Sequence, residues 1–328
     1  MIAKFSKLLI ALIPISLLSI SCNKEVKDVG PVAPKSVIEM AQQEPDLSLF
    51  AEATILSNVE YHLNPGATYT LLAPTDSSFS DFLNKLGLTS VAELKSHFGN
   101  EYFTQFIRYH ILEGKVRTEN LADGYVLTFA ELNDGDRLHS YMSRTGSITS
   151  INGQAEVRSA NMESTGGVIH KLNGVLTPLC LDGLIRVNPR YSKLNEVIDF
   201  TDPRMDSVLK SSDNGYHTLL APTDAAFNLF LNYYGYTDLT TLFGLITKDQ
   251  MADALKYHII KGKVRAEDFQ NAEYKTLLAG AALNITKDTS GTIIITDDKG
   301  VALIKIISTN IVGINGVMHT IDKVLEFQ

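Results

Sequence analysis

The chain has 328 residues, of which 45% are hydrophobic and 20% are charged, a composition that excludes wholesale disorder and a length that suggests two domains. The formal net charge is −8, from 29 basic and 37 acidic side chains, so there is no basic excess to neutralise phosphates and we expect no nucleic-acid partner. Two cysteines are too few for a disulfide-dense scaffold.

Residues 1–21 are predicted to be a lipoprotein signal peptide. Two lysines precede an apolar run over residues 8–20, which is shorter than the ~20 apolar residues that a membrane-spanning helix needs. A small residue followed by Cys22 ends the run and resembles the lipobox of bacterial lipoproteins, although Ser19 stands where that motif usually has Leu. The resemblance implies cleavage before Cys22 and lipidation of its thiol. The alternative is an ordinary secretory signal with a chance cysteine.

Residues 22–35 are predicted to be a flexible tether, because they are polar, contain Gly and Pro, and lack a helical or strand period. Lys24 and Glu25 loosely resemble the charged export tags of Bacteroidetes surface lipoproteins. Acyl chains on Cys22 would hold the protein to a membrane. We therefore expect a lipid-anchored protein of the bacterial cell envelope, at the surface or periplasmic face of the outer membrane.

The rest of the chain contains three sequence blocks that each occur twice, in the same order and 148 or 149 residues apart. A period this long indicates a duplicated domain rather than a short solenoid repeat. We call the two copies repeat 1 (residues 36–182) and repeat 2 (residues 188–328). The joint between them is short, so we expect the repeats to touch. The blocks are residues 69–79 and 217–227, with eight of eleven identities, 109–118 and 257–266, with seven of ten, and 167–176 and 316–325, with five of ten.

In chain order, each repeat is predicted to open with two helices, followed by a short buried strand that ends at a proline. A helix capped by a Thr-Asp pair comes next, and two further helices lead to a Tyr-His pair. Gly114 and Gly262 are predicted to end these helices as C-caps. The second half of each repeat is rich in β-branched residues and predicts strands. The opening helices are expected at residues 36–43, 46–57, 191–200 and 203–210, the strands at 70–73 and 218–221, and the caps at Thr75, Asp76, Thr223 and Asp224.

The three blocks resemble those of the fasciclin (FAS1) domain. The first box of that family reads Thr, two hydrophobic residues, Ala-Pro-Thr, Asp or Asn, any residue, then Ala-Phe. Residues 218–227 match this box fully, and residues 70–79 differ from it only at Ser78. The final box is complete at residues 315–325. In repeat 1, Gly166 and Asn173 replace the Asn and Asp of that box.

The resemblance implies an α+β fold of two tandem fasciclin-like domains, each a β-sandwich wedge with packed helices. It also implies adhesion or extracellular binding rather than a defined reaction. The sequence shows no Gly-x-Ser-x-Gly elbow, no His-Glu-x-x-His, no Walker loop and no Cys-x-x-Cys. We therefore predict that the protein is not an enzyme and needs no cofactor or metal, with an unrecognised hydrolase as the remote alternative. The acidic residues 133–136 are expected to form a turn, and Cys180 to be an inert buried thiol.

The repeated Tyr-His pairs and the basic residues after them are the candidate ligand-binding groups. In animal fasciclin proteins, a Tyr-His flanked by bulky apolar residues has been proposed to contact integrins, and two cations on alternate strand positions suit an acidic glycan. The other interpretation is that each histidine packs inside the domain and bonds to backbone, and that the basic residues line a solvated strand edge. No ligand spacing favours a metal. The candidates are Tyr109, His110, Tyr257, His258, Lys263 and Arg265.

These observations predict a lipid-anchored cell-envelope adhesion or binding protein. Its expected partners are the membrane, through the lipid on Cys22, and an extracellular protein or glycan. Two domains on one chain would gain avidity when both engage the same surface. The alternative is a glycan-binding accessory lipoprotein for polysaccharide capture, for which the tyrosines at positions 233, 234 and 236 are the best candidates.

Overall fold

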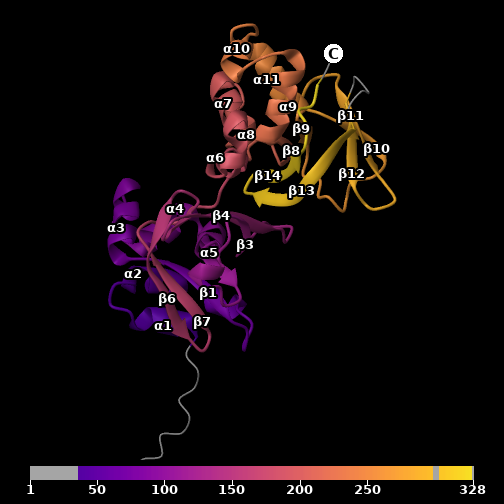
Figure 1. Cartoon of the computed structure of the whole chain (residues 1–328). Helices are drawn as coiled ribbons and strands as arrows, with labels where there is room; N and C mark the ends of the chain where they lie inside the picture. Colours follow the sequence, from indigo (N-terminus) through magenta and orange to yellow (C-terminus); the bar gives the residue numbers. More distant parts are fainter. Residues whose placement is uncertain (1–35, 298–302, 327–328) are drawn as a thin grey trace, which may run out of the picture. The chain divides into compact units, whose positions relative to one another are not determined.

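The computed structural model describes residues 36–297 and 303–326, so the predicted signal peptide, Cys22 and the tether lie outside the described residues. All described residues belong to one compact unit, Pro34–Gln328, and both repeats lie within it (Figure 1). Helices come first and strands later in each repeat, which confirms the α+β prediction.

Repeat 1 is built from five short helices and a seven-stranded sheet. The sheet order is β2-β1-β7-β6-β5-β4-β3, and only the pair β1 and β7 runs parallel among these neighbours. The elements are α1 (Val37–Gln43), α2 (Ser48–Leu56), η1 (Val59–His62), β1 (Tyr69–Pro74), α3 (Asp76–Lys85), α4 (Val91–Phe98), α5 (Asn100–Arg108), β2 (Ile111–Glu113), η2 (Thr118–Asn120), β3 (Gly124–Glu131), β4 (Arg137–Thr145), β5 (Ile148–Ile151), β6 (Ala155–Ser164) and β7 (Gly167–Leu172).

Repeat 2 has the same plan, with sheet order β10-β11-β12-β13-β14-β8-β9 and a parallel pair β14 and β8. The joint between the repeats is itself a helix, α6 (Leu181–Val187), which the sequence analysis did not predict. The other elements are η3 (Pro189–Tyr191), α7 (Ser192–Thr201), α8 (Asp206–Leu209), β8 (His217–Pro222), α9 (Asp224–Tyr234), α10 (Leu239–Phe243), α11 (Lys248–Tyr257), β9 (Ile259–Lys261), β10 (Ala272–Lys275), β11 (Ala282–Lys287), β12 (Ile293–Thr296), β13 (Leu303–Gly313) and β14 (Gly316–Ile321).

The Leu-Leu-Ala run of the strand in the first block is apolar because both faces of the strand are covered. In β1, Leu71 and Ala73 pack into the helical core of repeat 1, while Leu72 packs on the opposite face among residues of the β4–β7 half of the sheet. Successive strand residues point to opposite faces, so a run without polar residues indicates burial on both sides. Strand β8 follows the same rule, with Leu219 facing the helices and Leu220 facing the strands.

The Thr-Asp pair after this strand caps two helices instead of one. Thr75 Oγ1 accepts a hydrogen bond from the Ser78 N–H at 3.4 Å and caps α3, as predicted. Asp76 reaches back to an earlier element, where its Oδ1 accepts from the Leu49 N–H of α2 at 2.8 Å. Asp224 does the same for Lys193 of α7, also at 2.8 Å. The pair therefore satisfies N–H groups at the starts of two helices that meet beside β1 or β8.

The prediction for Gly114 and Gly262 was wrong in one respect. Helix α5 ends at Arg108 and α11 at Tyr257, and each is followed by a three-residue strand before the glycine. The two glycines, with φ of 82° and 93°, end the strands β2 and β9 rather than the helices. The apolar residues after each Tyr-His pair are the reason, because they leave the helix and pair with β1 or β8.

Candidate functional site

The side chains of both Tyr-His pairs lie inside their domains, with His258 the most exposed at 5%. In repeat 1, His110 follows the end of α5. Its Nδ1 donates to the Phe106 carbonyl at 3.0 Å, and its Nε2 accepts from the Leu176 N–H at 3.0 Å. The ring therefore joins the last turn of a helix to the segment that follows β7. Burial lowers the pKa of His110 to about 4, so the ring is neutral at pH 7.

His258 repeats this geometry in repeat 2. Its Nδ1 donates to the Ala254 carbonyl at 2.8 Å, its Nε2 accepts from the Leu325 N–H at 3.0 Å, and burial lowers its pKa to about 4. Both ring nitrogens of each histidine are thus engaged with backbone. These contacts fit the interpretation that the histidines hold the fold, while direct ligand contact by them stays a prediction.

The tyrosines of the pairs have the same character. The Tyr109 hydroxyl donates to the His139 carbonyl at 2.7 Å and accepts from Asn152 Nδ2 at 3.0 Å, and burial raises its pKa. The Tyr257 hydroxyl donates to the Ala282 carbonyl at 3.4 Å. Each tyrosine therefore ties the end of its helix to the strand half of its repeat. Ligand binding by Tyr109 and Tyr257 stays untested.

The second basic block carries ion pairs between the repeats. Lys263 pairs with Asp134 and with Asp136, the latter at 2.5 Å, and Arg265 also pairs with Asp136. The side chains of Lys263 and Asp136 are 9% and 6% exposed. Burial alone would lower the pKa of Lys263, but the two carboxylates raise it above its ordinary value. Lys263 and Arg265 thus have acidic partners within the chain, and their binding of an external ligand stays a prediction.

The acidic partners come from residues 133–136, which form the predicted turn, between β3 and β4. The opposite charges of the turn and the basic block were visible in the sequence, but nothing in the pattern placed them together. Apolar contacts continue this junction, since Val312 of β13 and Val317 of β14 pack with Leu138 and Met142 of β4. A hydrogen bond also joins the repeats there, because the backbone N–H of Val312 donates to His139 Nδ1 at 3.0 Å.

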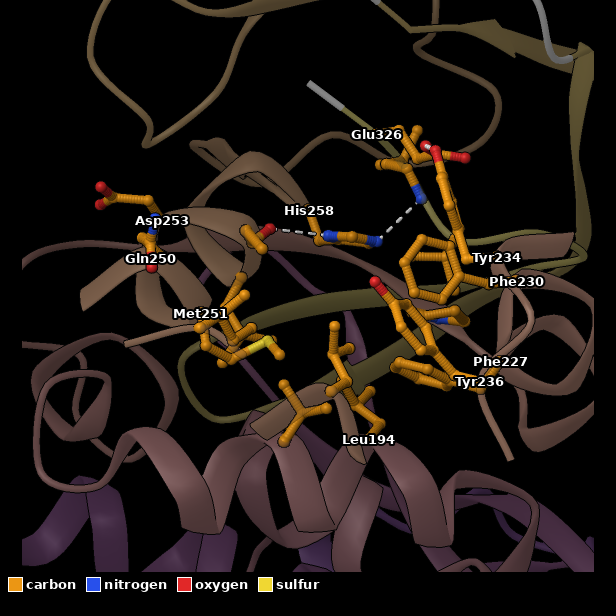
Figure 2. Close-up of a pocket in the computed structure, with 18 residues that line it drawn as sticks. Leu194, Phe227, Phe230, Tyr234, Tyr236, Gln250, Met251, Asp253, His258 and Glu326 are labelled. Carbon is orange, nitrogen blue, oxygen red and sulfur yellow. Dashed lines mark hydrogen bonds between the residues drawn. The ribbon is translucent and has the colours of Figure 1, made fainter. Parts of the chain in front are cut away.

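An apolar pocket of about 410 Å³ opens into repeat 2 among α7, α9, α11 and the segment after β14 (Figure 2). Figure 2 shows Phe230 and Tyr234 at the right of the pocket, Met251 at the left, Leu194 below and His258 above. The pocket is of the size of small-molecule sites in proteins. The pocket was not predicted from the sequence.

Comparison of the repeats explains why the pocket is open. His110 and His258 make equivalent contacts with α5 and α11, so these two helices align with a spacing of 148 residues. Asp76 and Asp224 cap α2 and α7 in the same way, so these two helices also correspond. At the aligned positions, repeat 1 has rings where repeat 2 has smaller or aliphatic side chains. Phe50, Phe98, Phe103 and Phe106 correspond to Leu194, Ile246, Met251 and Ala254.

In repeat 1 the extra rings fill the space. Phe106 stacks on Phe82 with ring centroids 5.6 Å apart and planes 14° apart, and it also contacts Phe98 and His110. Phe106 is fully buried. In repeat 2, Phe230 corresponds to Phe82, but Ala254 stands at the position of Phe106 and supplies no ring to stack on Phe230. This replacement of Phe by Leu, Ile, Met and Ala was the sequence signal for the pocket.

The charged groups that line the pocket are the two carboxylates Asp253 and Glu326. The Tyr234 hydroxyl donates to the Glu326 carboxylate, and Asp253 pairs with Lys256 at 2.8 Å. The described residues that line the pocket include no Lys or Arg. Across residues 36–297 and 303–326, no group of three or more His, Cys, Asp or Glu side chains is placed to hold a metal ion. In the same residues, every helix is too short or too polar to cross a bilayer.

Known proteins share this sequence pattern over both repeats. The model of the fasciclin domain matches residues 45–178 and 189–327. Transforming growth factor-beta-induced protein ig-h3 of Sus scrofa is 24% identical over 263 residues, which are 80% of this chain and 35% of that protein. Periostin of Homo sapiens is 27% identical over 261 residues, 76% of this chain and 27% of its own length. The chain thus spans about a third of the length of these relatives. A solved FAS1 domain pair from the insect cell adhesion molecule fasciclin I aligns with a TM-score of 0.47 and 17% identity, covering 86% of this chain and 97% of that one.

Proposed function

Because this chain belongs to the fasciclin domain family, we propose that it is a lipid-anchored adhesion and binding protein of the bacterial cell envelope. The observation that carries the proposal is the pair of fasciclin domains, at residues 45–178 and 189–327, on one short chain. Fasciclin domains are typically cell-adhesion and binding modules. Two such modules on one chain gain avidity, because the second contact becomes intramolecular once the first has formed.

The proposal includes binding without catalysis. The histidines shared by the repeats, His110 and His258, have both ring nitrogens engaged with backbone and pKa values of about 4. A general base needs a free nitrogen within reach of a substrate proton and a pKa near the working pH. This geometry favours a structural role for the repeated residues and leaves the domain surfaces for partners.

Attachment to cells is the first experiment. Cells producing the protein and cells producing a variant with Asp136→Ala, which weakens the junction of the repeats, are compared for adhesion to immobilised matrix proteins. We expect the parent to adhere and the variant to adhere less, because avidity depends on joint display of the two domains. Absence of adhesion by the parent to every protein and glycan surface would contradict the proposed function.

The anchor is tested separately through Cys22. We expect Cys22→Ala to abolish labelling by a palmitate analogue and to release the protein from the membrane fraction, because acyl chains supply the attachment. Cys180→Ala is the matched control, since Cys180 is a partly buried thiol whose pKa is raised by burial. Retained labelling of the Cys22 variant would contradict lipidation at this residue.

A second candidate, polysaccharide capture, is favoured by exposed tyrosines at the end of α9. The Tyr233 side chain is 79% exposed, and its ring lies 5.0 Å from that of Tyr234. Sugar rings stack on exposed aromatic faces. Binding to a glycan array that falls with Tyr233→Ala, but not with Tyr61→Ala at an 89% exposed site in repeat 1, would favour this function over protein adhesion.

A further inference from the structure

We propose that the pocket of repeat 2 is a binding site for a small aromatic molecule that is neutral or cationic. This site goes beyond the proposed function, because it is a pocket within a single repeat. It shares Tyr234 and Tyr236 with the tyrosines considered for polysaccharide capture, whereas Tyr233 does not line it. The proposal rests on the shape of the pocket, on the rings that repeat 1 places in the same position, and on the charge of the lining groups.

The aromatic class of the ligand follows from the comparison of the repeats. In repeat 1, the face of Phe82 is covered by the Phe106 ring, with centroids 5.6 Å apart and planes nearly parallel at 14°. In repeat 2, Phe230 lines the pocket and Ala254 stands where that second ring would begin. A ligand ring stacked on Phe230 would restore the missing layer. Such stacked aromatic pairs are stabilised beyond the burial of their area.

The remaining walls suit the edges of a ring system. Leu194, Ile246 and Met251 supply aliphatic contacts at positions where repeat 1 has phenylalanines. Methionine is flexible and polarizable, and its sulfur makes favourable contacts with aromatic edges. With about 410 Å³, the pocket admits a molecule of several rings rather than a single side chain.

The charge of the ligand follows from the groups that face the pocket. The lining residues include the carboxylates Asp253 and Glu326 but, among described residues, no basic side chain. His258 contributes no positive charge, because its ring is neutral and its nitrogens are bonded to backbone. An anionic ligand would lose hydration without gaining a cationic partner, so carboxylated or sulfonated molecules are disfavoured.

Two fluorescent probes with one ring skeleton test this proposal. N-phenyl-1-naphthylamine is neutral, and 8-anilinonaphthalene-1-sulfonate carries the same rings with an added sulfonate. We expect saturable one-to-one binding of the neutral probe to the purified protein and at least tenfold weaker binding of the sulfonate. No saturable binding of the neutral probe, or tighter binding of the sulfonate, would overturn the proposal.

Variants then locate the bound probe. Ala254→Phe returns the ring that repeat 1 carries and should lower affinity for the neutral probe at least tenfold while the protein stays folded, with at most a small decrease in melting temperature. Met251→Phe narrows the same pocket from another wall and provides the test if the first variant does not fold. Leu229→Phe adds a ring on the exposed face of α9, where Leu229 is 60% exposed, and should leave affinity unchanged. Unchanged affinity in a folded Ala254→Phe or Met251→Phe protein would show that the pocket is not the site.

Discussion

The two repeats share their blocks but use the space between the helices differently. In repeat 1, Phe50, Phe103 and Phe106 are fully buried and in contact with other rings, so the helical core is closed. In repeat 2, the aligned residues are smaller or aliphatic, and a pocket lies in the same place. The blocks that identify the family therefore specify the backbone, whereas residues between the blocks decide whether the interior is filled or open.

The basic blocks differ in the same way. Lys115 and Arg117 of repeat 1 pair with Glu163 at partly exposed positions of their own domain. In repeat 2, Lys263 is buried against Asp136 of the other repeat. The position aligned with Glu163 is Val312, which packs into the junction, so the repeat 2 cations have no carboxylate there. One motif thus forms a surface ion pair in one copy and a buried junction in the other.

The largest expected effect concerns what the repeats share. Burial lowers the pKa values of His110, His258 and His319 to about 4, whereas an unfolded histidine titrates near 6.5. Between these pH values the unfolded chain binds more protons at these histidines, so their contribution to the free energy of unfolding falls as the pH drops from about 6.5 to 4 and is fully present above about 7. Each shift corresponds to ~3 kcal/mol. Denaturant unfolding across this range measures the loss.

The control for this prediction is a histidine outside the core. His97, in α4, shows no such burial, and His97→Gln should leave the pH profile unchanged. His110→Gln should flatten the profile while lowering stability at pH 7, because it removes one of the groups whose protonation opposes folding. A parent protein equally stable at pH 7 and pH 4.5 would contradict the assignment of neutral buried rings.

A cavity placed in repeat 1 should have the next largest effect. Phe106→Ala removes a fully buried ring from the closed core and should cost about 3–5 kcal/mol of unfolding free energy. The reverse change in repeat 2, Ala254→Phe, adds a ring where there is space and should cost less than about 1 kcal/mol. Tyr102→Ala, at a 40% exposed site on the same helix as Phe106, is the control. Equal costs for the two core changes would show that the repeats are packed alike.

The loss of unfolding free energy on breaking an ion pair should be larger for the more buried pair. Asp136→Ala leaves Lys263, whose side chain is only 9% exposed, with one carboxylate fewer. It should cost roughly 3 kcal/mol, since removing one partner of a largely buried ion pair leaves the other charge poorly compensated. Glu163→Ala in repeat 1 should cost less than about 1 kcal/mol, because its pairs are exposed to solvent and salt. The measurement is urea unfolding at low and high salt. Equal effects of the two substitutions would remove the distinction between the basic blocks.

The fold was predictable because local signals agreed with one another. The apolar strand, the terminal proline and the Thr cap each followed from one residue pattern, and Thr75 and Thr223 cap α3 and α9 as expected. Gly114 and Gly262 were placed on the wrong element because a glycine ends a strand or a helix equally well, and the deciding contact with β1 or β8 is not local. Helix α6 was missed for a related reason. Its start is held by a distant residue, Asn315, whose Oδ1 accepts from the Leu181 N–H at 2.8 Å.

The candidate site was harder to predict than the fold. Tyr109 and His110 have the residue types of a recognition motif, but types alone do not reveal that their polar atoms are satisfied inside the domain. The partners of Lys263 and Arg265 in the other repeat, Asp134 and Asp136, lie about 130 residues earlier in the chain, and only the fold brings them together. The pocket depends on aromatic rings that repeat 2 lacks at positions where repeat 1 has them. Only an alignment of the two repeats could have indicated it.

The smallest expected effect concerns Asn173, which departs from the Asp of the fasciclin final box. Its Oδ1 accepts from the Glu156 N–H at 2.6 Å, and Asp322 of repeat 2 makes the same contact with the Lys305 N–H at 2.8 Å. Asn therefore retains the hydrogen-bonding role of Asp. The neighbour explains the choice, because a carboxylate at position 173 would face that of Glu156, whereas Asp322 lies beside a lysine.

Asn173→Asp should consequently cost only about 0.5 kcal/mol, since the acceptor is kept and the added repulsion is between partly exposed charges. The double variant Asn173→Asp with Glu156→Lys recreates the repeat 2 combination and should recover that loss, and high salt should shrink both effects. A double-mutant cycle of chemical unfolding measures the coupling between the two positions. A loss of more than about 2 kcal/mol that salt does not reduce would mean that the Asn173 amide donates a bond that repeat 1 needs. The two final boxes would then differ in structure and not merely in charge.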